Sequence, residues 1–228
     1  WRFFECYNLK SFTFGASVTV IPRNIFGDCF ALEEVIFQEG LEHIQYMFAT
    51  SSLATRGEMT QVKSLHIPAS VKLIDEYAAQ SFSMMETLSF APNSMLETIG
   101  KGAFKYCFSL KTIVNLPSSI ATIGEEAFYD CSSLEALDMG SLAVTDIPDN
   151  TFFNSVSMAT LVLPKNLATI GENAFYGCGV VDLHIPAVVT SIGKSAFENA
   201  TAMKTLTFPQ DSMFISLGSL EEELSIFK

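Results

Sequence analysis

A repeated pattern of apolar residues constrains this chain more than any other feature. Each copy opens with an apolar residue that is followed, three and five positions later, by two more, as in Met158, Leu161 and Leu163. The pattern opens at nine places, 22 to 30 residues apart: Leu9, Leu32, Val62, Met85, Leu110, Leu134, Met158, Val180 and Met203. Registered copies at such a period predict a solenoid, in which stacked coils bury one another's inner faces.

Each half of the repeat has its own local pattern. The alternation around Leu161 predicts a short strand, which ends at Pro164 because proline has no N–H to give to a parallel ladder. A second apolar pair and a turn at Gly171 follow. About seven residues then remain before Cys178, enough for one or two helical turns that packing on neighbouring coils must stabilise.

The segment from Val180 to Ala200 carries a resemblance to a known family. It reads VVDLHIPAVVTSIGKSAFENA and resembles the BspA-like branch of the leucine-rich repeat superfamily, whose unit reads roughly L-x-x-I-x-I-P-x-x-V-x-x-I-G-x-x-A-F-x-x-C. The resemblance covers essentially the whole chain. It implies an α/β repeat solenoid, a right-handed superhelix of about nine coils of 22–25 residues. The same resemblance implies a parallel β-sheet on the concave side and short helices or turns on the convex side.

The repeat boundaries predict a single solenoid domain over residues 1–228. We expect a partial first coil at 1–8, coils from about 9 to 218, and a tail at 219–228. The extra residues within 49–61 predict a surface loop, since lengthening a loop costs little entropy, although a functional loop is the alternative. No stretch approaches the ~18 uninterrupted apolar residues of a membrane-spanning helix.

The cysteines share one position in the repeat, the third residue after a phenylalanine: Cys6, Cys29, Cys107, Cys131 and Cys178. This register predicts buried, structural thiols, which behave as small apolar side chains. A disulfide between Cys107 and Cys131, on adjacent coils, remains the alternative. No C-x-x-C motif or His/Cys cluster suggests a metal site.

The remaining polar residues suggest no catalytic chemistry. His66 and His184 occupy the same strand position five coils apart, which is on the order of 24 Å at the strand spacing of a sheet. That separation is too long for a shared metal or a catalytic pair. No nucleophile, base and orienting group converge. With a net charge of −12 and no basic run, nucleic acid is not an expected partner. We therefore expect a non-enzyme without cofactor or metal, and without membrane insertion.

Outward positions along the strands are the candidates for binding. The first such position alternates in sign over six copies: Lys10, Glu33, Lys63, Glu86, Lys111 and Glu135. Alternation predicts an ionic ladder that supports the register, and a polar binding face is the alternative. The candidate binding residues on the concave face are Glu86, Thr87, Lys111, Thr112, Glu135, Asp138, Thr160, Asp182 and His184.

Two functions fit these features. The first is a recognition module that binds a protein or glycan partner on its concave face, since solenoids present extended curved surfaces. The family resemblance implies an extracellular or cell-surface location and adhesive roles, which is an argument by fold. The second is a structural spacer or scaffold segment of a larger multi-subunit assembly. In either case we expect neighbouring domains or subunits to cover the open solenoid ends.

Overall fold

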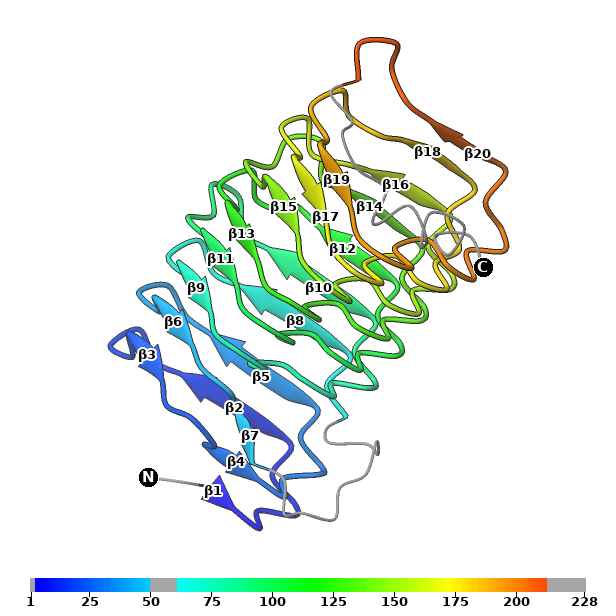
Figure 1. Ribbon diagram of the computed structural model, residues 1–228. Helices are drawn as coiled ribbons and strands as arrows, with labels where there is room; N and C mark the ends of the chain where they lie inside the picture. The colour runs from blue at the N-terminus through cyan, green and yellow to red at the C-terminus, as the bar shows by residue number, and fades with distance from the viewer. Residues whose placement is uncertain (1–2, 50–60, 213–228) are drawn as a thin grey trace.

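The computed structural model describes residues 3–49 and 61–212, which wind into a stack of coils (Figure 1). These residues form twenty short strands and no helix. The extra residues of the second repeat, 50–60, and the predicted tail, 219–228, lie outside the described residues.

The strands fall into three series, one for each side of the coil. The first series is β2 (Ser11–Phe14), β5 (Glu34–Phe37), β8 (Ser64–Ile67), β10 (Thr87–Phe90), β12 (Thr112–Val114), β14 (Ala136–Asp138), β16 (Thr160–Val162), β18 (Asp182–His184) and β20 (Thr205–Thr207). The second is β3 (Val20–Ile21), β6 (His43–Ile44), β9 (Leu73–Ile74), β11 (Thr98–Ile99), β13 (Thr122–Ile123), β15 (Asp146–Ile147), β17 (Thr169–Ile170) and β19 (Ser191–Ile192). The third is β1 (Phe3–Phe4), β4 (Phe26–Gly27) and β7 (Phe48–Ala49). We call the outward side of the first series the long-strand face.

Every strand pair is parallel and offset by one repeat. Thr87 of β10, for example, aligns with Ser64 of β8 and with Thr112 of β12. The nine apolar markers of the sequence correspond to the nine strands of the first series. The structure thus confirms a parallel β-solenoid. Its nine first-series strands and eight second-series strands make about eight turns, against the nine coils expected.

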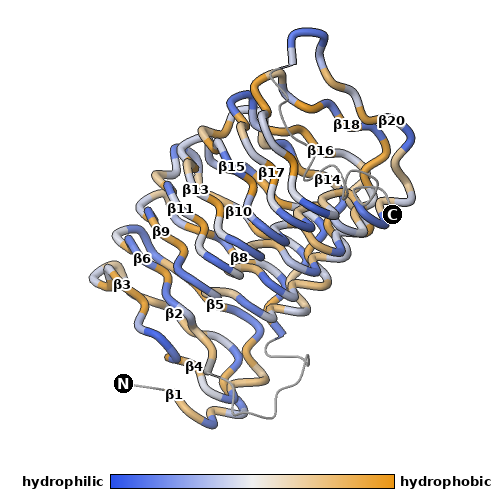
Figure 2. The backbone as a smooth tube through the Cα atoms, viewed as in Figure 1, coloured by the Kyte–Doolittle hydropathy of each residue, from blue (hydrophilic) through white to orange (hydrophobic). Residues whose placement is uncertain are grey.

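The core is continuous along the stack because inward positions recur in every coil. On β16, Leu161 is buried between two exposed neighbours, as the alternation predicts. Figure 2 shows hydrophobic and hydrophilic stretches recurring at matching places in successive coils. A column of buried rings runs along one side, with neighbouring centroids 5.4–5.5 Å apart: Phe104, Phe128, Phe152, Phe175 and Phe197.

The predicted short helices, and with them the α/β class, are wrong. In seven coils, the segment where the spacing predicts a helix has two residues four apart with left-handed backbone angles, as at Asn150 (φ 56°) and Asn154 (φ 59°). A right-handed helix does not tolerate such angles. The N–H of Phe152 instead donates to the carbonyl of Ala174 on the next coil, at 2.8 Å. Beyond the short strands β1, β4 and β7, the third side of the coil is therefore a stack of turns bonded between coils.

The cysteine prediction is confirmed for four of the five positions. Cys29, Cys107, Cys131 and Cys178 are buried, Cys6 is half-buried, and all five are free thiols. Burial is the main reason that the pKa of Cys178 is raised to about 12. These four buried thiols therefore pack as small apolar side chains.

Candidate binding site

Outward side chains of the long-strand face form three columns, each running along the stack. The predicted Glu86, Lys111 and Glu135 lie in the column just before the strands, and all three are exposed. Thr87, Thr112, Thr160 and Asp182 occupy the first outward position of their strands, whereas Asp138 and His184 occupy the second. The nine candidates therefore lie on one face, but they spread over several coils.

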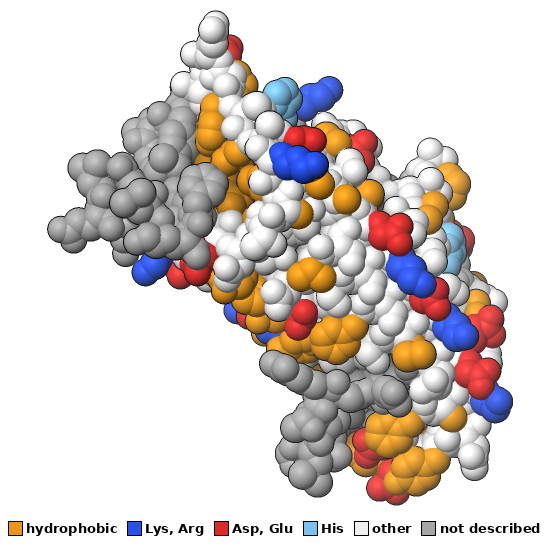
Figure 3. Space-filling model, turned by 90° about the vertical axis from the view of Figure 1, so that its right-hand side faces the viewer, with side chains coloured by type: hydrophobic (Ala, Val, Ile, Leu, Met, Phe, Trp, Pro, Cys, Tyr) orange, Lys and Arg blue, Asp and Glu red, His pale blue; other side chains and the backbone are white. Residues whose placement is uncertain are grey.

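The first column is an ionic ladder for part of its length. Lys10 pairs with Glu33 at 2.9 Å, and Lys111 pairs with Glu86 at 2.9 Å. A hydrogen bond from Lys111, together with its charge, holds the pKa of Glu86 below its usual value. Figure 3 shows acidic and basic side chains alternating along one edge of the molecule. Exposed pairs of this kind contribute little to stability because water and salt screen them.

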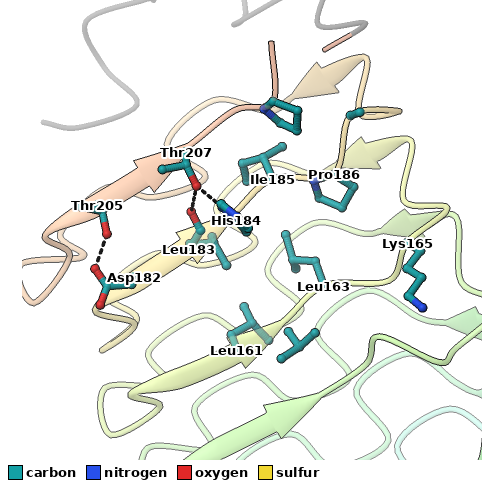
Figure 4. A pocket seen from close by; sticks show the side chains of 13 residues that line it. Leu161, Leu163, Lys165, Asp182, Leu183, His184, Ile185, Pro186, Thr205 and Thr207 are labelled. Atoms are coloured by element: carbon teal, nitrogen blue, oxygen red, sulfur yellow. Dashed lines mark hydrogen bonds between the residues drawn. The ribbon is translucent and has the colours of Figure 1, made fainter. Parts of the chain in front are cut away.

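A cavity of about 720 Å³ lies at the C-terminal end of the long-strand face, along β16, β18 and β20 (Figure 4). Its lining is mainly apolar: Val162, Pro186, Ala187 and Pro209 are exposed or half-exposed, whereas Leu161, Leu163, Leu183 and Ile185 also belong to the buried core. Its polar residues are Lys165, Asp182, His184, Thr205 and Thr207. The lining thus combines an apolar surface with a few polar groups, which is the usual composition of a ligand site.

Hydrogen bonds between coils fix the polar residues of the cavity. Thr205 donates to the Asp182 carboxylate, and the Thr207 hydroxyl contacts Nδ1 of His184. The Thr207 hydroxyl also lies 3.3 Å from the carbonyl oxygen of Leu183. Figure 4 shows Asp182 and Lys165 on opposite sides of the cavity, so a bound molecule would meet an acidic and a basic group at separate points.

The cavity brings together only two of the nine predicted residues, Asp182 and His184. The other seven are not among the residues that line it. Sequence reasoning missed Lys165, Thr205 and Thr207. The two threonines could have been found by extending the outward columns to the last strand, because their register partners are Asp182 and His184.

The described residues offer no evident metal or membrane chemistry. Within residues 3–49 and 61–212, no group of three or more His, Cys, Asp or Glu side chains could hold a metal ion. His66 interacts with Ser89 on the adjacent strand, at 3.0 Å, and lies far along the stack from His184. The same part of the chain contains no helix that could cross a membrane.

Together, the one-repeat register, the apolar columns and the stacked turns define a leucine-rich-repeat-like β-solenoid. The chain belongs to the family described as the BspA type leucine rich repeat region, whose model matches six copies over residues 1–135, 57–180 and 123–226. Among curated proteins, none matches this chain.

Solved structures of bacterial repeat proteins are similar to this chain. A leucine rich cell surface protein from Faecalibacterium prausnitzii is 27% identical with a TM-score of 0.63, over 76% of this chain and 44% of that protein. A leucine rich repeat protein from T. pallidum is 24% identical (TM-score 0.42, 62% and 56% covered). One from Bacteroides ovatus is 19% identical (TM-score 0.35, 90% and 74% covered). The chain thus spans less than half of the F. prausnitzii protein.

Proposed function

We propose that this chain is a non-enzymatic recognition module that binds an extended segment of a protein partner on its long-strand face. The observation that carries the proposal is the cavity along β16, β18 and β20, with its apolar lining and its separated polar groups. Its volume, about 720 Å³, lies within the range of small-ligand and side-chain pockets. The binding residues are those of the cavity, with Asp182 and His184 at its polar side.

The chemistry of the lining favours a peptide over a glycan. Apolar side chains such as Val162, Pro186 and Pro209 suit an apolar anchor residue, whose burial contributes roughly 25 cal/mol per Å². Among the described residues, the lining includes no Phe, Tyr or Trp, which would give the flat face on which a sugar ring stacks. Lys165 and Asp182 suit a segment with an acidic residue at one end and a basic residue at the other.

The family and the fold support a surface location for the module. The F. prausnitzii protein is described as a cell surface protein, and we extend that location to this chain as part of the proposal. A rigid stack of coils holds the outward columns in fixed positions, which reduces the ordering cost of binding. A spacer role would need the stack of coils but not the cavity. Ligand binding in the cavity therefore distinguishes the recognition module from a spacer.

A peptide selection with matched variants tests the proposal. A phage-displayed library of random dodecapeptides is selected on the protein, and enriched peptides are measured against two variants. Val162→Arg places a charge in the cavity, whereas Val114→Arg makes the same change at an equivalent position on β12, outside it. Both valines are exposed, 44% and 39%, so neither change should disturb the core.

We expect Val162→Arg to raise Kd at least about tenfold, a loss of about 1.4 kcal/mol, and Val114→Arg to leave it unchanged. Equal effects of the two variants would reject the cavity as the binding site. If glycans on an array probed in parallel bind the protein and no peptide is enriched, the partner is a glycan and not a protein. Binding of neither probe would favour the spacer role.

A further inference from the structure

Two cysteines lie side by side at the N-terminal end of the described solenoid. Phe3 pairs with Phe26, and Phe4 with Gly27, so the same offset of 23 residues aligns Cys6 with Cys29. The preceding residues, Glu5 and Asp28, share left-handed backbone angles of 58° and 54°. The two thiols therefore occupy the same place on adjacent coils.

The first coil also contacts the Cys29 thiol directly. Sγ of Cys29 lies 3.4 Å from the carbonyl oxygen of Phe3, and the N–H of Glu5 donates to the carbonyl of Gly27 at 2.8 Å. Parallel strands lie about 4.8 Å apart, which is within the Cα separation of about 4.4–6.8 Å that disulfides span. The pair is thus close enough to be joined after a small adjustment.

The similar pair Cys107 and Cys131 would need the same adjustment, and the two pairs differ in exposure. In-register side chains point the same way, so their Cβ atoms stay near the strand spacing, whereas a disulfide needs about 3.5–4.5 Å. One coil must therefore move toward the other by up to roughly 1 Å.

The coils of Cys107 and Cys131 are held on both sides. The carbonyl of Lys105 accepts a hydrogen bond from the N–H of Ser81 on the preceding coil, and the N–H of Asp130 donates to Phe153 of the following one. Both thiols are completely buried. Cys6 is half-buried, so an oxidant can reach it, while Cys29 need only react within the molecule.

We propose that Cys6 and Cys29 are an oxidation site, at which a reversible disulfide ties the first described coil to the second. The oxidant is a low-molecular-weight disulfide. The Cys6 thiolate attacks it, which releases one small thiolate and forms a mixed disulfide on Cys6. The Cys29 thiolate then attacks Sγ of Cys6 and releases the second small thiolate. Two protein thiols are oxidised, one small disulfide is reduced, and the two thiol protons pass to solvent.

The site suits a protein outside the cell, where disulfides persist. It needs neither the cavity nor a bound partner, so its test is independent of the proposed recognition function. Burial raises the pKa of Cys29, so the second step accelerates as pH rises toward that value. The bond links the first described coil to the second and slows local opening between them.

Thiol counting after treatment with oxidised glutathione tests the proposal. The protein is treated folded at mildly alkaline pH, its small thiols are removed, and its remaining thiols are alkylated after unfolding and counted by mass. We expect the five thiols to fall to three, with a tryptic peptide pair linking Cys6 to Cys29 that dithiothreitol separates. The control variant Cys6→Ala, which introduces the residue that Ala200 supplies at the same repeat position, should keep all four of its thiols.

Three results would overturn the proposal. The wild-type protein could keep five thiols, it could stop at a glutathione adduct on Cys6, or it could link Cys107 to Cys131 instead. Hydrogen exchange gives a second measure, since the bond should slow amide exchange across residues 3–14. Unchanged exchange in a fully linked protein would show that the bond does not restrain the coil.

Discussion

A single methyl group added at Gly124 should disrupt the stacking of coils. A Cβ at this position would lie 2.4 Å from the backbone nitrogen of Lys101 and 2.7 Å from the carbonyl carbon of Gly100, both on the preceding coil. Ordinary contacts are 3.4–4 Å. The clash is with backbone, so no side-chain rotation can relieve it. Gly15 provides the matched control, because a Cβ there meets nothing within 4 Å.

The magnitude follows from two opposing effects. Overpacking that moves a backbone costs about 1–3 kcal/mol. Replacing glycine by alanine also restricts the unfolded chain, which contributes about 0.4–1 kcal/mol of stability where the native backbone is unstrained. From the midpoints of these ranges, we expect Gly124→Ala to lower the free energy of unfolding by roughly 1.3 kcal/mol, and by at most about 2.6 kcal/mol. Gly15→Ala should raise it by about 0.4–1 kcal/mol.

Urea unfolding followed by far-ultraviolet circular dichroism measures both variants. The transition midpoint should move down for Gly124→Ala and up for Gly15→Ala, with similar slopes for the two. A shift of equal size and sign in both variants would refute the reasoning, because it would mean that the coils do not approach as closely as the stack requires.

Three further predictions test the core, the electrostatics and the thiols. Phe152→Ala should lower the free energy of unfolding by about 3–5 kcal/mol, because the ring is fully buried between two others; a loss below about 1 kcal/mol in urea unfolding would contradict this. Hydrogen bonds from Thr169 and Thr145 lower the pKa of Asp146 in the folded state. The stability that the ionised carboxylate contributes is therefore present above the unfolded-state pKa and is lost as pH falls through the folded-state pKa. The stability difference between wild type and Asp146→Asn, less than about 1 kcal/mol, should therefore shrink progressively as pH falls below about 4; a difference that grows in acid would contradict it. The pKa of Cys178 is raised to about 12, so this thiol should react with an aromatic disulfide reagent only after unfolding; rapid labelling of the folded protein would count against its burial.

The inward columns could be predicted from sequence because they depend on one coil alone. Alternation around Leu161 identifies a strand, and repetition of that pattern identifies its neighbours. The third side could not be predicted from apolar spacing, because a helical turn and a turn with two left-handed residues place Ala and Phe similarly. The signal that separates them is the residue type at Asn150, Asn154, Asn173 and Gly177, since Asn and Gly tolerate positive φ.

The candidate site could be predicted only in part, because it depends on more than one coil. Asp182 and His184 follow from the column rule, which identifies outward positions. The cavity depends on how β20 and the turns at Pro186 and Pro209 lie against β16 and β18. That arrangement involves three coils and departs from the average repeat. No single-coil pattern predicts it.

The central claim is that the coils bond to one another without forming helices. The acceptor of one backbone hydrogen bond tests this claim most directly. In a deuterated, isotope-labelled sample, scalar coupling across the hydrogen bond identifies the acceptor of the Phe152 N–H. The stacked-turn solenoid predicts coupling to the carbonyl carbon of Ala174, one coil further along the chain. Coupling to Pro148, four residues earlier, would show a helical turn and contradict the account.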